Sequence, residues 1–133
     1  MARGIGFEGI NSHYTTFKVS ATTKAIVLAS GVSAIEGKAI ALTGNQEVGF
    51  GSDGNDFFGV IDKYEDDGYA TVQDQGYREN VPAVSGSVPT FGSKNIVVDG
   101  AGSVKASGTP TTRGLIVESD STANVNTVTI LIG

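Results

Sequence analysis

The length, composition and charge of the chain restrict the classes of protein to which it can belong. Its 133 residues suit one compact domain, and 19 glycines with 17% charged residues favour turns and short strands over long solvated helices. A net charge of −5 repels a phosphate backbone, so we expect no nucleic acid as a partner, and the lack of cysteine excludes disulfides and thiolate metal sites.

Residues 1–23 predict an extended N-terminal arm. The first 14 residues lack the apolar stretch of a signal peptide, and no apolar run in the chain approaches the roughly 20 residues that cross a bilayer. We therefore expect synthesis in a host cytoplasm and no membrane partner. The large apolar residues of the arm follow neither a strand nor a helix period, which suggests that they contact a partner or a neighbouring subunit: Ile5, Phe7, Ile10, Tyr14 and Phe17. The alternative is an arm folded back on its own domain.

Residues 24–133 predict an all-β domain, a small barrel or sandwich of short antiparallel strands. Short β-branched segments alternate there with glycine, asparagine and aspartate, and apolar residues alternate clearly in 38–43 and 125–132. The one helical candidate, residues 32–36, is too short to be stable alone.

Two Asp-Gly pairs predict hairpins, because this dipeptide suits the positive φ of hairpin turns. The first hairpin runs over residues 59–73 with its turn at 65–68, and the second runs over 97–105. The alternation of the strands then predicts one shared core that contains Ile40, Leu42, Val60, Val72, Ile96, Val98, Ile116, Val128 and Ile130.

The sequence also contains an internal echo. A shift of 56 residues places Lys38, Ile40, Leu42, Gly44 and Val48 on Lys94, Ile96, Val98, Gly100 and Val104. Either two glycine-rich β segments match by chance, or residues 37–76 and 93–133 are pseudo-repeated halves that share one core.

The residues offer little support for catalysis, and we expect no enzyme. A catalytic triad or dyad with a serine or cysteine nucleophile would need His13, the single histidine, as its base. His13 follows Ser12 in the arm, however, and no nucleophile-elbow motif is nearby. The sequence also lacks nucleotide-binding glycine motifs, so we expect no cofactor.

Two acidic turns are the remaining candidates for ligand binding. Residues 53–56 resemble the start of a calcium loop, but the closing glutamate is replaced by Tyr64, so a turn between strands explains them better. The cluster Glu65, Asp66 and Asp67 suits a solvated hairpin tip. We therefore expect no required metal.

Six segments stand in a fixed order along the chain: GKAIALT at 37–43, GV at 59–60, DGYATVQDQG at 67–76, VPA at 81–83, GSKNIVVDGAGSVKA at 92–106 and RGLIVE at 113–118. Their order and spacing resemble the head decoration, or capsid cement, family of tailed bacteriophages. The resemblance covers residues 24–133 and leaves the arm outside it. It implies a small non-enzymatic β protein that joins the expanded capsid, often as a trimer, with the major capsid protein as its partner.

The expected function is that of a virion structural protein, which binds the outer surface of the assembled phage capsid and stabilises it. A ligand of the assembled shell stabilises that shell by mass action, and repeated copies add to the effect. One alternative is a carbohydrate- or receptor-binding β module of a virion, with tyrosines as its aromatic platform. A tail-tube or head-completion protein is a third class.

Overall fold

The computed structural model describes residues 12–65, 67–108, 114–122 and 125–133, and in them the protein is mostly β. The elements in chain order are β1 (His13–Val19), α1 (Ala21–Ser30), the 3-10 turn η1 (Val32–Ala34), β2 (Ala39–Gly44), β3 (Glu47–Gly49), β4 (Gly59–Tyr64), β5 (Tyr69–Pro82), β6 (Ile96–Val98), β7 (Val104–Ala106), β8 (Leu115–Thr122) and β9 (Val125–Ile132). The all-β prediction is confirmed, with a helix added to it.

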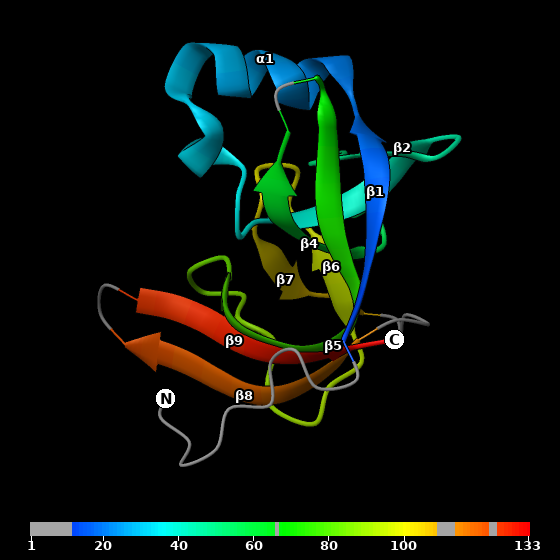
Figure 1. Ribbon diagram of the computed structural model, residues 1–133. Helices are drawn as coiled ribbons and strands as arrows, with labels where there is room; N and C mark the ends of the chain where they lie inside the picture. The colour runs from blue at the N-terminus through cyan, green and yellow to red at the C-terminus, as the bar shows by residue number, and fades with distance from the viewer. Residues whose placement is uncertain (1–11, 66, 109–113, 123–124) are drawn as a thin grey trace.

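Five strands close into a barrel in the order β1, β3, β2, β4, β5, because β1 pairs with β5 as well as with β3. β1 and β3 run parallel, whereas the remaining neighbours around the barrel are antiparallel. Each barrel strand is therefore paired on both sides, which removes the exposed edges of an open sheet. Figure 1 shows α1 across one end of the barrel and β8 and β9 beyond the other.

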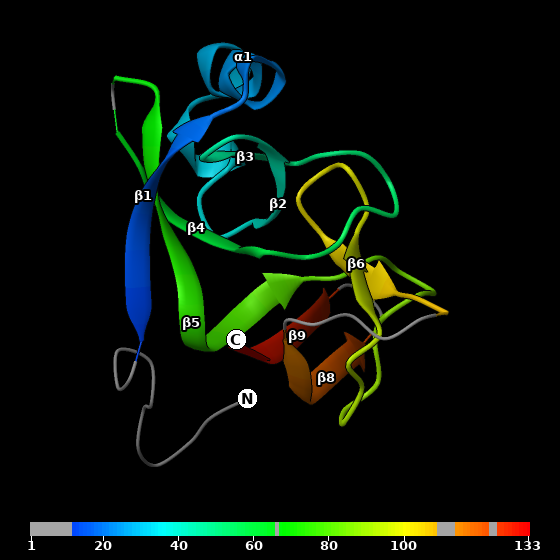
Figure 2. The ribbon, with the colours of Figure 1, turned by 90° about the vertical axis from the view of Figure 1, so that its right-hand side faces the viewer.

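β5 is long enough to serve two sheets. Its first half, from Tyr69 to Gln75, pairs with β1, and from Gly76 onward it pairs with β9. Gly76 has a φ of 108° and lies against Ser12, so the strand bends there where a side chain would not fit (Figure 2). β8 pairs with the far side of β9, while β6 and β7 form a separate two-stranded sheet.

Two apolar clusters pack the described part of the chain. The barrel cluster comprises Val19, Ile35, Ile40, Val48, Phe50, Ile61, Ala70 and Val72. The sheet cluster comprises Ala39, Ala41, Phe57, Val60, Val81, Ala83, Ile96, Val98, Val104, Ile116, Val128, Ile130 and Ile132. Successive residues of β2 and β4 alternate between the two clusters, so these strands form the wall that separates them.

Eight of the nine predicted core residues are buried, and the exception is Leu42, which is 52% exposed. The end of β2 projects from the barrel (Figure 1), and its register with β3 shifts between Leu42 and Gly44, so the face begun by Ile40 does not stay inward. The expectation of one shared core is also wrong. Ile40 and Val72 belong to the barrel cluster, and the other six buried residues belong to the sheet cluster.

The arm predicted over residues 1–23 is wrong in its second half. Residues 1–11 lie outside the described part of the chain, but His13–Val19 form β1 in the barrel wall. Backbone pairing to β5 and β3 holds this strand, and only Phe17 and Val19 supply inward apolar side chains. Two apolar positions in seven residues make too weak a period to reveal a strand.

α1 was not predicted, because its residues form no clear inward stripe and Thr23 is its one buried residue. Its ends carry recognisable caps. The N–H of Thr23 donates to Oγ of Ser20 at 3.3 Å, and the N–H of Gly31 donates to the carbonyl of Val27 at 2.8 Å. The predicted short helix at residues 32–36 corresponds to η1.

Both predicted hairpins are confirmed, since β4 pairs with β5 and β6 pairs with β7. In the second turn, Oδ1 of Asp99 accepts hydrogen bonds from the N–H groups of Ala101 and Ser103, at 2.8 and 3.0 Å. The aspartate side chain thus provides a hydrogen-bond acceptor for two backbone N–H groups of the turn.

The internal echo corresponds to two hairpins of the same register. Leu42 lies opposite Val48 in β2 and β3, and Val98 lies opposite Val104 in β6 and β7, which is the same pair displaced by 56 residues. The halves as wholes are not equivalent, because β2 and β3 are part of the barrel whereas β6 and β7 form their own sheet.

Candidate functional site

The structure separates the arm residues that we predicted as partner contacts. Ile5, Phe7 and Ile10 lie outside the described residues. Tyr14 is 42% exposed on the outer side of β1, whereas Phe17 turns to the other side and meets the ring of Phe58 edge-on, with ring centres 5.4 Å apart. Phe17 packs against its own barrel cluster and is only partly buried, so its role as a partner contact stays a prediction. Tyr14 stays a candidate contact.

His13 joins β1 to β5 through its side chain. Its Nδ1 lies 2.7 Å from Oδ1 of Asp74, and the hydroxyl of Thr15 donates to the other carboxylate oxygen at 2.9 Å. The hydroxyl of Ser12 instead accepts a bond from the amide of Gln73, at 3.5 Å. These bonds of His13 and Thr15 link β1 to β5.

The predicted turn at residues 53–56 docks onto β6. The N–H of Gly54 donates to the carbonyl of Val98, and the N–H of Val98 donates to the carbonyl of Asn55, both at 2.9 Å. Oδ1 of Asn55 is also used, because it accepts from the N–H of Ser52, and the carboxylate of Asp53 pairs with Lys105. These contacts give the turn a structural role.

The second acidic turn closes the hairpin of β4 and β5. The N–H of Glu65 donates to the carbonyl of Tyr69 at 2.7 Å, and Oδ1 of Asp67 accepts from the N–H of Tyr69 at 3.2 Å. Asp66 lies outside the described residues. In the part of the chain that is described, no three acidic or histidine side chains gather closely enough to hold a metal ion.

The exposed side of α1 carries a large apolar side chain and few charges, a feature that the sequence analysis missed together with the helix. Leu28 is 85% exposed, and the exposed residues around it follow helical spacing: Ala21, Ala25, Ala29 and Val32. Lys24 is the one charged residue of the helix, and its amine lies near Gly68 in the turn between β4 and β5. Helices on the surface of soluble proteins usually carry charge on this side.

Phe91 and Val117 form a second exposed apolar pair. Phe91 is 75% exposed, and the neighbouring N–H of Gly92 donates to the carbonyl of Ile116 at 2.6 Å, which places Phe91 beside the start of β8. The remaining exposed apolar side chains, such as Leu42, lie apart from this pair on other elements. The exposed side of α1 thus differs from this pair in that its apolar residues follow a regular helical spacing.

Comparison with known proteins adds no relative: no protein-family model matches the chain, and no curated protein matches it. No helix among the described residues has the length and apolar character needed to span a membrane.

Proposed function

We propose that this protein is a virion structural protein, which binds the outer surface of an assembled phage capsid and stabilises it. The observation that carries the proposal is the exposed side of α1 around Leu28, which has one charged residue, Lys24. The six segments that resemble the decoration family support it further, since their described residues lie in the β domain.

The α1 face is suited to burial against another protein. Contiguous exposed apolar residues mark interaction surfaces, and a helix with a single charged residue enters an interface with little desolvation of ions. Three alanines at spacings of four residues, Ala21, Ala25 and Ala29, let a partner approach the helix closely, and Leu28 projects beside them. Burial of one leucine contributes about 1.5–3 kcal/mol.

The partner in this proposal is the major capsid protein, and the protein acts as a homo-oligomer, with a trimer favoured by the resemblance. Ile5, Phe7, Ile10 and Tyr14 are proposed as additional contacts. Binding that requires the assembled shell stabilises that shell without any chemical step, and many identical copies multiply the effect.

Co-sedimentation tests this function. The protein should pellet with expanded capsids and should not bind free coat subunits. Leu28→Lys should weaken capsid binding by about 10- to 100-fold, the equivalent of the burial energy of one leucine. Leu42→Lys is the matched control, because it places the same charge on another exposed leucine, and it should bind as the unchanged protein does. Equal binding by Leu28→Lys and Leu42→Lys contradicts the role of α1, and failure of the unchanged protein to bind capsids contradicts the function.

A carbohydrate- or receptor-binding module is the second candidate. Tyr14 and Tyr69 are both more than 40% exposed, and their strand partners place them on one face of the paired strands β1 and β5. Exposed aromatic rings on a β surface suit stacking against sugar rings. A glycan array that shows binding abolished by Tyr14→Ala would favour this candidate over capsid decoration.

A further inference from the structure

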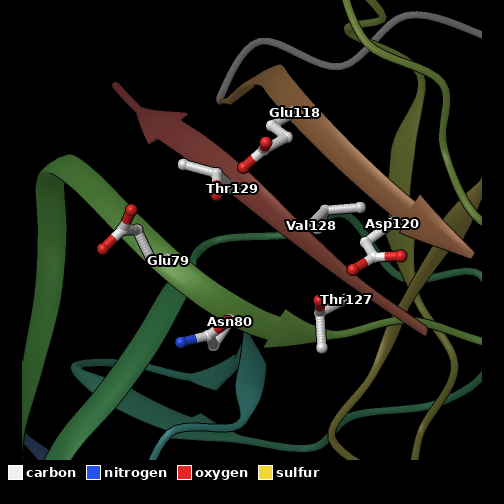
Figure 3. Close-up of a pocket in the computed structure, with 7 residues that line it drawn as sticks. All are labelled: Glu79, Asn80, Glu118, Asp120, Thr127, Val128 and Thr129. Carbon is white, nitrogen blue, oxygen red and sulfur yellow. The ribbon is translucent and has the colours of Figure 1, made fainter. Parts of the chain in front are cut away.

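The outer face of the sheet formed by β5, β9 and β8 contains a shallow acidic hollow of about 180 Å³ (Figure 3). Its lining includes Thr129 on β9, Glu79 from β5, and Glu118 and Asp120 from β8. No Lys or Arg is among the described residues that line it. The volume is below the roughly 300–1,000 Å³ of small-molecule pockets, so it suits the head group of one side chain.

Two β-bulges build this hollow on either side of Thr129. In β5, Glu79 and Asn80 together face one residue of β9, since Arg78 pairs with Ile130 and Val81 pairs with Val128. Asn80 has a left-handed φ of 59°.

The second bulge lies in β8. Ile116 pairs with Ile130 and Glu118 pairs with Thr129, so Val117 is the extra residue. Bulges redirect side chains, and Glu79 of β5 and Glu118 of β8 flank Thr129 from its two neighbouring strands.

The hydroxyl of Thr129 has no hydrogen-bond partner among the described residues, although Thr129 is only 4% exposed. A buried hydroxyl without a partner is unusual in a folded protein, and it is the group that a bound donor would satisfy. The other two buried polar residues differ from it, since Thr23 bonds the N–H of Phe50 and Gln73 bonds backbone carbonyls.

The chemistry of the hollow favours a guanidinium. Among the described residues, no three acidic or histidine side chains lie close enough together to bind a metal ion. The carboxylates of the hollow are therefore separated from one another. A guanidinium presents five N–H donors in a plane and reaches several separated acceptors, whereas an ammonium is a compact point charge. The carboxylates of Glu118 and Asp120 and the hydroxyl of Thr129 supply acceptors of this kind.

We propose that this hollow receives an arginine side chain of a protein partner. The inference rests on the proposed function only in that the natural partner would be the capsid protein. The net charge of −5 of this protein favours a positively charged side chain as the occupant. The site lies on the sheet beyond the end of the barrel opposite to α1 (Figure 1), so it offers a second contact that is independent of Leu28.

The test uses tetra-arginine and tetra-lysine peptides as probes, measured by fluorescence anisotropy with the full chain. Tetra-arginine should bind at least about tenfold more tightly than tetra-lysine, because the two peptides differ in geometry and not in charge. The double variant Glu118→Gln/Asp120→Asn should lose this preference. The control Glu47→Gln/Asp56→Asn changes the net charge equally at other places on the molecule and should keep it.

Thr129→Val separates binding from folding. It removes a hydroxyl without a partner among the described residues, so the melting temperature of the free protein should stay equal or rise, while tetra-arginine binding falls several-fold. A fall in the melting temperature with binding unchanged would overturn the assignment.

Two other outcomes also overturn the proposal: equal binding of the two peptides, or equal losses in the two double variants. The capsid assay is read separately. If the unchanged protein binds tetra-arginine selectively but does not bind capsids, the arginine site is supported and the proposed function is contradicted. If it binds capsids but binds the two peptides equally, the proposed function is supported and the arginine site is contradicted.

Discussion

Gly76 joins the two halves of β5, and its replacement by alanine should destabilise the fold well beyond the usual effect of an alanine at a positive φ. Two penalties combine there. The φ of 108° is one that side chains rarely adopt, and a Cβ at this position would lie 2.9 Å from Cα and 2.5 Å from Oγ of Ser12. Because Cα belongs to the backbone, the contact cannot be relieved by rotating a side chain.

The two penalties can be estimated separately. A residue with a Cβ at positive φ costs about 1–2 kcal/mol, and overpacking against a rigid neighbour costs about 1–3 kcal/mol. Gly76→Ala should therefore lower the free energy of unfolding by about 2–5 kcal/mol. Gly86→Ala is the control, since Gly86 has a φ of 80° with nothing within 4 Å of an added Cβ, and it should cost only about 1–2 kcal/mol.

Urea denaturation followed by circular dichroism measures both variants. The difference between them should be about 1–3 kcal/mol, which corresponds to several degrees in melting temperature for a domain of this length. Equal destabilisation by Gly76→Ala and Gly86→Ala would refute the placement of Ser12 against the bend of β5, and with it the inclusion of residue 12 in the folded domain.

Three further predictions concern the barrel and its turns. Phe17→Ala should destabilise the protein by about 2–3 kcal/mol, and a double-mutant cycle with Phe58→Ala should give a coupling of about 0.5–1.5 kcal/mol; a coupling near zero would contradict the edge-to-face contact. Ser20→Ala should cost about 1 kcal/mol through loss of the α1 cap, measured by thermal denaturation against Thr22→Ala, which should cost less. EDTA should leave the melting temperature unchanged, because Asp53 and Asn55 already have partners within the protein; a fall of several degrees would make residues 53–56 a calcium site.

The strands and hairpins of the second and third quarters of the chain could be predicted because their signals are local. Asp-Gly pairs encode turns, and alternation placed Ile40, Val60 and Val72 inside correctly. Leu42 shows the limit of this reasoning. Its alternation is as clear as that of Ile40, but whether a neighbouring layer covers the end of β2 depends on where the strand projects.

The candidate surfaces were harder to predict than the fold. The arm residues were selected because they lack a period, and Phe17 shows that such a residue can still pack in a barrel through backbone pairing of its strand. The signal that could have revealed the α1 face was present as caps, with Ser20 before the segment and Gly31 after it. Applied there, the helical spacing of Ala21, Ala25, Leu28 and Ala29 would have predicted an apolar face.

The sequence by itself determined the all-β class, the two hairpins and the residues of the central strands that are buried, because turn chemistry and side-chain alternation act over a few neighbouring residues. Tertiary structure alone decided the rest. Closure of the barrel depends on β1 reaching both β3 and β5, and the bend at Gly76 sends one strand into two sheets. The acidic hollow needs Glu79, which is distant in the chain from Glu118 and Thr129 and reaches them only through the pairing of β5 with β9. Contacts of this kind are set by which strands lie side by side, and no local pattern specifies that.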